Sequence, residues 1–390
     1  MVNPFTPGNG IEPHFLAGRD KALDEFTRSL KAFENGLPQN TVVYGLRGTG
    51  KTVLARRFKI IAETRGWAVV EREFNEKFAQ EELLANSLSS DIVSTAAEVS
   101  VKKKIEQAGK KLLDTFKPET LSAYGITYTP YYRDEVKLFG DYIKGILLSN
   151  WPVFHKAGKK GVILLYDEMH HVRDIRETKQ YGLSSLLEAL SYVQREGCRY
   201  SLCAVGLPSL KINLKDAKTY TERMFNFQET SNLPPEEARK ALLKPLMKTG
   251  YSFDKVLTAR IVSETNGYPY FLQFYGYYLI ENSAKKRLTL ADFEDTHKEL
   301  LSRLDKSFFE DRFKLASDGE KKVLTAMAHA DEEEISTKEI AQKTKASYGA
   351  IIELLVRLSE KGLVYRVKKG KYSFTIPLFR NFLKRQSKHI

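Results

Sequence analysis

The sequence predicts an α/β fold: a parallel sheet sandwiched by helices, then an all-α region, then a small C-terminal unit of three helices and a hairpin. Two features predict the sheet. An apolar run at residues 41–44 leads through a glycine-rich loop into helix-like sequence, and a second apolar run at residues 162–166 ends in an acidic pair. Continuous apolar character is typical of parallel strands that are buried on both faces.

Residues 45–52 read Gly-Leu-Arg-Gly-Thr-Gly-Lys-Thr, a complete phosphate-binding loop of the P-loop NTPase type. The glycines let backbone N–H groups close around phosphates, which also lie at a helix N-terminus. In this motif Lys51 reaches the β- and γ-phosphates, and the Thr52 hydroxyl binds Mg²⁺. A glycine-rich surface turn is the alternative. The loop predicts a site for ATP or ADP with Mg²⁺, with these contact residues: Gly45, Arg47, Gly48, Thr49, Gly50, Lys51, Thr52 and Val53.

Asp167 and Glu168 follow the second apolar run directly. An acidic pair at the C-terminal end of a buried strand is the expected partner of a phosphate-binding loop. We expect Asp167 to hold Mg²⁺ and Glu168 to orient and deprotonate the attacking water. The alternative is an acidic pair at a helix N-terminus, where the helix dipole favours it. The adjacent glutamate favours an ATP hydrolase over a kinase.

Two histidines, His170 and His171, come next. Neighbouring residues point to different faces of a helix, so we expect no metal clamp from this pair. We place both side chains at the surface or behind the reacting groups.

The composition favours a globular protein of two or three domains, with 390 residues of which 42% are hydrophobic. No apolar run is long enough to cross a bilayer, and the N-terminus shows no secretory pattern. The only cysteines, Cys198 and Cys203, are too few for a metal site, so we interpret them as reduced core thiols. We expect a cytoplasmic protein without a membrane partner.

The net charge of +13 is unevenly distributed. The last fifty residues carry twelve Lys and Arg against two acids, a net charge of +10, which leaves +3 for the other 340 residues. A local excess of this kind predicts a polyanionic partner.

The same region predicts a winged helix-turn-helix: helices at 321–328 and 337–341, a third helix from Ser347 to about residue 361, and a hairpin with a basic tip at 368–371. A module of this kind binds double-stranded DNA or acts as a protein-interaction or autoinhibitory unit; the charge favours DNA. The expected DNA contacts are Tyr348, Arg357 and Lys361 on the third helix and Lys368, Lys369 and Lys371 on the wing, the lysines meeting phosphates.

Together these motifs resemble AAA+ ATPases, specifically the origin-recognition and STAND-like branches, over nearly the whole chain. Phe15-Leu16-Ala17-Gly18-Arg19-Asp20 resembles the segment that precedes the first helix in that family and packs near the adenine. The resemblance implies a nucleotide-binding core at 1–232, a helical lid at 233–310, a winged helix-turn-helix at 311–390, and ATP between core and lid.

The resemblance also implies further site residues. Residues 220–225 resemble the stretch with the arginine finger, so Arg223 would neutralise charge on the ATP of a neighbouring subunit; an ordinary surface arginine is the alternative. Gly267 and Pro269 match the Gly-x-Pro motif that contacts nucleotide in STAND-like ATPases, or else form a turn between helices. No lid arginine is assigned, because Arg260 precedes that motif.

One position departs from the family pattern. The strand at 199–206 should end in a polar residue that senses the γ-phosphate, but it ends in Val205-Gly206, and Ser209 is the nearest hydroxyl. Between the two apolar runs, interleaved Tyr and Lys at 101–132, including a β-like stretch at 126–132, indicate either a nucleic-acid contact or a solvated helix with a peripheral hairpin.

The sequence therefore predicts an ATP-dependent switch that couples nucleotide state to DNA binding. Two alternatives remain open. One is a STAND-like signalling or defence ATPase, which would assemble with itself or with an effector protein. The other is a DNA-targeting ATPase of a mobile element.

Overall fold

The computed structural model describes residues 3–8, 10–108, 139–376 and 378–386, so the predicted β-like stretch at 126–132 lies outside the described residues. The chain divides into two compact units. One unit comprises residues 19–45 and 51–230, and the other comprises 1–18, 46–50 and 231–390. We describe each unit by itself.

The first unit is built on a five-stranded parallel sheet in the order β2-β3-β4-β1-β5. The five strands are β1 (Asn40–Gly45), β2 (Ala68–Glu73), β3 (Val162–Asp167), β4 (Tyr200–Gly206) and β5 (Phe225–Thr230). Because the strands are parallel, their C-terminal ends lie at one edge of the sheet. The phosphate-binding loop follows β1, and the acidic pair closes β3. This confirms the predicted sheet.

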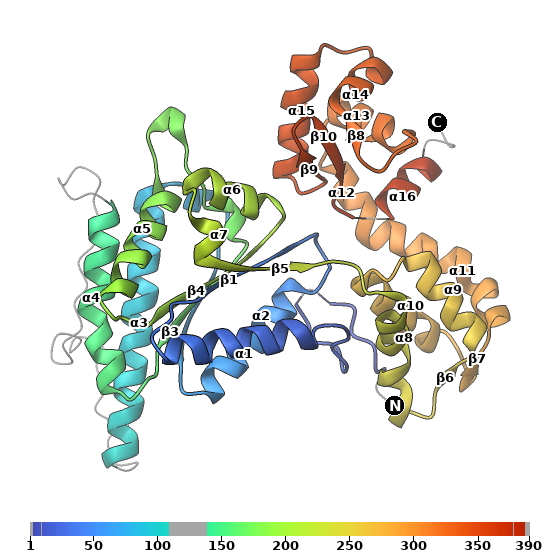
Figure 1. Ribbon diagram of the computed structural model, residues 1–390. Helices are drawn as coiled ribbons and strands as arrows, with labels where there is room; N and C mark the ends of the chain where they lie inside the picture. The colour runs from blue at the N-terminus through green and yellow to red at the C-terminus, as the bar shows by residue number, and fades with distance from the viewer. Residues whose placement is uncertain (1–2, 9, 109–138, 377, 387–390) are drawn as a thin grey trace. The chain divides into compact units, whose positions relative to one another are not determined.

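Helices cover both faces of this sheet (Figure 1). Strand residues alternate between two cores: Ile163 and Leu165 pack in one, Val162 and Leu164 in the other. The first core includes α1 (Asp20–Glu34) and α2 (Lys51–Thr64). The second includes α3 (Glu81–Ala108), α4 (Phe139–Lys156), α5 (Gly182–Arg195) and α6 (Ser209–Ala217). Cys198 and Cys203 are free and buried, as predicted.

The second unit begins with helices α8 (Pro235–Leu243), α9 (Lys255–Thr265), α10 (Pro269–Glu281) and α11 (Leu290–Leu304). This part is helical as predicted, with one small addition to the helices. Two short strands, β6 (Ser252–Phe253) and β7 (Arg287–Leu288), pair in parallel because their apolar residues, Phe253 and Leu288, are both buried in the helical core. Two residues per strand give too little periodicity for a prediction.

The C-terminal elements follow a short π-helix (Asp305–Phe309), called the π-turn, and α12 (Glu310–Lys314). The predicted three helices and hairpin are present as α13 (Asp318–Ala328), α14 (Thr337–Thr344), α15 (Tyr348–Glu360), β9 (Val364–Lys368) and β10 (Lys371–Phe374). A short strand β8 (Ile335–Ser336) completes the sheet, in the order β8-β10-β9. Ser336 and Ser347 cap α14 and α15 as predicted.

A last helix, α16 (Phe379–Gln386), was not predicted. Its Phe379 and Phe382 stack on Phe309 of the π-turn. Burial of these aromatic rings joins the C-terminal elements to the helices before them in a single hydrophobic core. None of the described helices is long and apolar enough to cross a membrane.

Candidate functional site

The phosphate-binding loop has the backbone that its glycines were expected to provide. Gly48 and Gly50 have positive φ values of 75° and 88°, in the left-handed region that favours glycine. The Thr49 hydroxyl donates to the Leu46 carbonyl over 2.8 Å and closes the loop. At Gly45 a Cβ would collide with the Thr230 carbonyl. The predicted loop residues therefore form a tight turn directly before α2.

Lys51 and Thr52 are the first two residues of α2, where backbone N–H groups have no partner within the helix. This is the place where a helix favours an anion. Lys51 is 6% exposed, and Val53 is buried as well, at 8%. The predicted nucleotide contact of Val53 stays a prediction.

The acidic pair meets the start of α2. Thr52 Oγ1 donates to Asp167 Oδ2 over 2.7 Å, and the Glu168 N–H donates to Asp167 Oδ1 over 2.8 Å. The two residues predicted to bind Mg²⁺, 115 positions apart, thus lie in direct contact. A hydroxyl beside a carboxylate is a set of hard oxygen ligands, which fits Mg²⁺.

Glu168 has a strained backbone. Its φ of 51° and ψ of 28° lie in the left-handed region, which non-glycine residues rarely adopt and which is found most often at functional sites. Only a short 3-10 turn, Met169–His171, follows it. The alternative reading of Asp167 and Glu168 as an acidic pair at the start of a regular helix therefore finds no support.

The two histidines do not diverge as predicted, because they lie in this tight turn and not in an α-helix. Their ring centroids are 4.2 Å apart, and His170 Nε2 lies 3.4 Å from Glu168 Oε2. One ligand atom from each of Glu168, His170 and His171 lies within 4.8 Å of the others, close enough to share a cation. The prediction of two histidines on different faces was wrong.

The Gly-x-Pro motif forms the turn between α9 and α10, which is the alternative given above, and its contact with nucleotide stays a prediction. Gly267 has a φ of 65°, and a Cβ there would collide with the Leu233 carbonyl; Pro269 begins α10. The residue between them, Tyr268, is buried, and its hydroxyl donates to the Arg47 carbonyl of the loop. Burial raises the pKa of the Tyr268 phenol, which keeps it a neutral donor. Gly267 and Pro269 thus shape the turn that presents Tyr268, which the sequence did not single out.

Two arginines lie close together at the loop. Arg47 Nε is buried and has no hydrogen-bond partner among the described residues. Burial, and after it the charge of Arg47, lower the pKa of Arg312, whose guanidinium donates to the Phe308 carbonyl over 2.6 Å. A polyphosphate would neutralise this pair of like charges. Arg312 follows an irregular π-turn, and no pattern in the sequence marks it.

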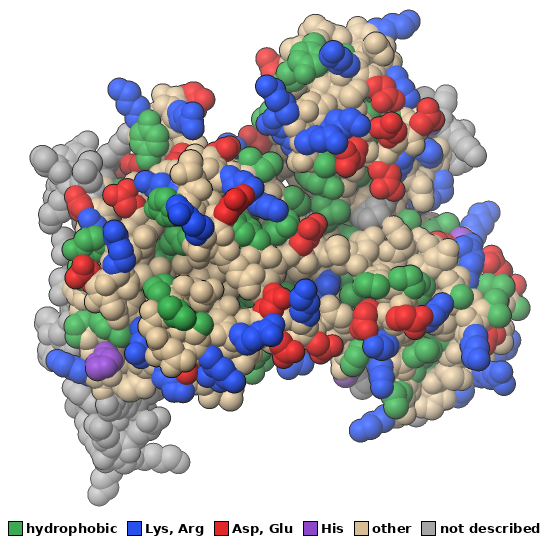
Figure 2. All heavy atoms as spheres, viewed as in Figure 1, with side chains coloured by type: hydrophobic (Ala, Val, Ile, Leu, Met, Phe, Trp, Pro, Cys, Tyr) green, Lys and Arg blue, Asp and Glu red, His purple; other side chains and the backbone are tan. Residues whose placement is uncertain are grey.

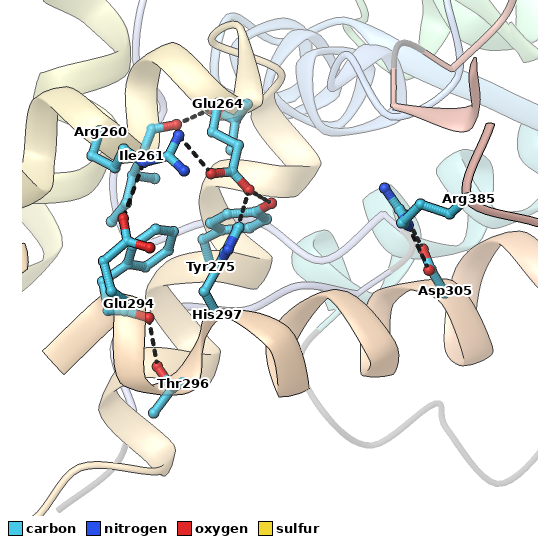
Figure 3. Close-up of polar contacts among 11 residues, drawn as sticks. Arg260, Ile261, Glu264, Tyr275, Glu294, Thr296, His297, Asp305 and Arg385 are labelled. Atoms are coloured by element: carbon cyan, nitrogen blue, oxygen red, sulfur yellow. Dashed lines mark hydrogen bonds and ion pairs between the residues drawn. The ribbon is translucent and has the colours of Figure 1, made fainter. Parts of the chain in front are cut away.

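Arg260 has a structural role (Figure 3). It forms ion pairs with Glu264 over 2.9 Å and with Glu294 over 3.4 Å. Glu264 also accepts hydrogen bonds from Tyr275 and lies 2.6 Å from His297 Nε2. Arg260 therefore belongs to a polar cluster among α9, α10 and α11, which agrees with leaving it unassigned.

Arg223 is exposed on α7 (Thr221–Met224), a four-residue helix directly before β5. It is in no ion pair within the described part of the chain. Its predicted action on a neighbouring subunit remains a prediction.

The predicted DNA contacts divide into two groups. Tyr348 and Arg357 are exposed on α15, Arg357 with a long ion pair of 3.5 Å to Glu353. Lys361 is exposed but already has partners within the domain. Its Nζ donates to the buried Glu320 over 2.6 Å and to the Leu315 carbonyl over 2.9 Å. Lys361 therefore compensates a buried charge within the domain.

The basic wing is partly neutralised. Lys368 pairs with Glu334 over 3.3 Å and Lys371 with Glu332 over 3.2 Å, while Lys369 is in no ion pair among the described residues. The pairing of β8 with β10 brings the acidic loop 331–334 beside the wing. Figure 2 shows acidic side chains next to basic ones on the visible face of these elements. The basic tip of the wing is therefore flanked by acids, and its contact with DNA stays a prediction.

The sequence patterns did not predict the exposed apolar strip that lies on α15. Tyr348, Ile352 and Val356 recur at four-residue spacing and are 49%, 38% and 45% exposed. The buried face of the same helix carries Ile351, Leu355 and Leu358. An exposed apolar strip of this kind is typical of a binding surface.

Comparison with known families and structures adds two domain matches. Residues 16–195 match the AAA ATPase domain family, and residues 306–383 match a domain of unknown function, DUF8462. No protein with curated annotation matches this sequence.

Among solved structures, the chain is similar to the Walker-type ATPase PABY2304 of Pyrococcus abyssi, with 16% identity, a TM-score of 0.61 and coverage of 95% of this chain and 96% of that one. The Orc1 protein of Aeropyrum pernix, solved in complex with DNA, has 15% identity and a TM-score of 0.47, with 97% and 96% coverage. Cdc6p of Pyrobaculum aerophilum has 14% identity and a TM-score of 0.45, with 98% and 97% coverage. The domain match at residues 16–195 agrees with the phosphate-binding loop and the parallel sheet, and the chain has the P-loop NTPase fold.

Proposed function

We propose that this protein is an ATP-hydrolysing AAA+ switch, in which Lys51 and Thr52 bind the triphosphate and Asp167 and Glu168 complete the reaction site. The observation that carries this proposal is the 2.7 Å hydrogen bond from Thr52 to Asp167, which joins the first turn of α2 to the C-terminal end of β3. These two elements meet at the sheet edge where ligands bind in open α/β folds.

The residues divide the chemistry among them. The backbone of the loop and the Lys51 ammonium bind the β- and γ-phosphates. Thr52 and Asp167 would hold Mg²⁺, which supplies charge neutralisation at the phosphate oxygens. Glu168 accepts the proton of the attacking water as the γ-phosphoryl group leaves ADP. The Tyr268 hydroxyl stabilises the loop by donating a hydrogen bond to the Arg47 carbonyl.

The substitution Lys51→Ala tests the ATPase proposal. We expect loss of ATP binding or turnover, measured with a fluorescent ATP analogue and by ADP production. Lys59→Ala is the matched control, because Lys59 lies on the same helix and pairs with Glu71 over 2.5 Å. Hydrolysis by Lys51→Ala at the rate of the unaltered protein would refute the assignment.

We further propose that residues 311–390 form a winged helix-turn-helix that binds double-stranded DNA, with the core at 1–232 and a lid at 233–310 coupling it to the nucleotide state. The net charge of +10 in the last fifty residues supports this. Lys345, Arg366 and Lys369 are exposed and in no described ion pair, so they join Arg357 as the cations best placed for phosphates.

A specific observation favours a second candidate. The exposed strip of Tyr348, Ile352 and Val356 lies on the helix expected to enter a DNA groove, and it suits a protein surface better than a phosphate backbone. In this case the C-terminal module contacts a protein partner, as in a STAND-like ATPase. Fluorescence anisotropy with labelled duplex DNA at two salt concentrations distinguishes the two. Salt-sensitive binding supports DNA, and absence of binding together with tight ADP retention supports a protein partner.

A further inference from the structure

The end of β4 carries no polar side chain, although it borders the reaction site. β3 and β4 are adjacent parallel strands, so Gly206 lies at the same sheet edge as Asp167. Directly beside Gly206 is His170, which comes from the turn after β3. We propose that His170 is a positioning residue that holds the Glu168 carboxylate for hydrolysis. This inference rests on the proposed ATPase function.

His170 is held on two sides. The Leu207 N–H donates to its Nδ1 over 3.4 Å, and the Asn213 side-chain amide donates to its backbone carbonyl over 2.9 Å. A Cβ at Gly206 would lie 3.2 Å from both the backbone nitrogen and Nδ1 of His170, so glycine provides the room for the ring. The His170 side chain is 8% exposed, so water does not compete freely for it.

These contacts decide which ring nitrogen faces Glu168. Because Nδ1 accepts the Leu207 N–H, the proton of the neutral ring belongs on Nε2. Nε2 is the nitrogen that lies 3.4 Å from Glu168 Oε2. The neutral imidazole therefore turns an N–H toward the carboxylate, although the structure has no hydrogen bond between the two groups. Catalytic hydrogen bonds are often long before substrate binds and shorten in the reacting complex.

The strained backbone of Glu168 belongs to the same turn as His170. A left-handed residue costs on the order of 1–3 kcal/mol and persists where the surroundings hold it. In the reacting complex, a hydrogen bond from His170 would fix one carboxylate oxygen and so the direction of the other, which takes the proton from water. His170 keeps its own proton throughout. Through the Leu207 amide, the position of Glu168 also depends on the end of β4 and the start of α6.

Three variants of the full-length protein test the proposal by steady-state ATP hydrolysis. We expect His170→Ala to lower kcat about tenfold or more while KM changes less than about twofold, because the ground-state contacts to the phosphates remain. His170→Gln should restore most of the rate, since its amide nitrogen replaces Nε2. His170→Asn should not, because its shorter side chain reaches only the position of Nδ1. His155→Ala, an exposed histidine on α4, is the control.

Melting temperature and binding of a fluorescent ATP analogue show whether each variant is folded. Equal loss of kcat in His170→Ala and His170→Gln would overturn the inference, as would an unchanged rate in His170→Ala. Glu168→Gln separates this inference from the ATPase proposal. If Glu168→Gln is inactive and His170→Ala is fully active, only the positioning role fails. If Glu168→Gln hydrolyses ATP at the normal rate, both proposals fail.

Discussion

The nucleotide site and the C-terminal module use charged residues in opposite ways. At the sheet edge, Thr52 and Asp167 contact each other directly, yet their oxygens remain a suitable ligand set for a cation. In the C-terminal module, three of the six residues predicted to contact DNA are paired with acids from elsewhere in the same domain: Lys361, Lys368 and Lys371. A motif that encloses its ligand can be recognised from neighbouring residues, whereas the charge of a surface depends on what folds against it.

The largest expected effect is on the rate of ATP hydrolysis, and it tests the contact between Thr52 and Asp167. Asp167→Asn should lower kcat for ATP by about 100-fold or more, because a neutral amide binds Mg²⁺ more weakly than a carboxylate does. ADP release measured across a Mg²⁺ titration checks this. Asp216→Asn, an exposed acid on α6, is the control. A normal rate in Asp167→Asn would mean that the contact with Thr52 is structural only.

The next largest effect is on the free energy of unfolding, and it tests the ion pair between Lys361 and Glu320. Lys361→Ala should destabilise the protein by about 2 kcal/mol, because it leaves Glu320 buried without its cation. Urea unfolding checks this, with the exposed Lys345→Ala as the control. If Lys361 instead served DNA alone, Lys361→Ala would leave the free energy of unfolding unchanged.

This destabilisation should depend on pH. Burial raises the pKa of Glu320, but hydrogen bonds from Lys361 and Ser317 outweigh it and lower the pKa below 4.5. A lowered pKa in the folded state stabilises the protein above the ordinary pKa, and this contribution is lost as the pH falls through the folded-state value. The difference between Lys361→Ala and the unaltered protein should therefore narrow below about pH 4.5. A constant difference between pH 7 and pH 3.5 would contradict this account.

A smaller effect tests the contact at the loop. Tyr268→Phe removes the hydroxyl that binds the Arg47 carbonyl and should weaken nucleotide binding and stability by about 1 kcal/mol. Tyr270→Phe is the matched control two positions away on α10. Equal nucleotide affinities in the two variants would show that the Tyr268 hydroxyl does not support the loop.

The smallest expected effect is a change in DNA affinity when the acids beside the wing are removed. Neutralising Glu332 and Glu334 with glutamine should free Lys371 and Lys368 and raise affinity for duplex DNA a few-fold at low salt. Lys369→Ala should reduce the slope of log affinity against log salt by about 1. Glu333→Gln, in no described ion pair, is the control. Unchanged affinity in the double variant would favour the protein-binding candidate.

The sequence predicted well where the chemistry is local. The loop from Gly45 to Thr52 requires glycines and a lysine at fixed spacing, and the structure places the acidic pair beside it as expected. The prediction failed for His170, because it assumed a helix where a 3-10 turn follows a left-handed glutamate. It missed Tyr268 because a buried tyrosine has no distinctive pattern in a single sequence.

The amino-acid sequence by itself determined the parallel sheet and the phosphate-binding turn, because both depend on residue type and short spacing. Only the tertiary structure decided which charges remain available. Acids at 331–334 face the wing because β8 pairs with β10, and Glu320 takes Lys361 because both pack on the same small core. Electrostatic partners are chosen by proximity in space, and that proximity arises from chain topology rather than from any local run of residues.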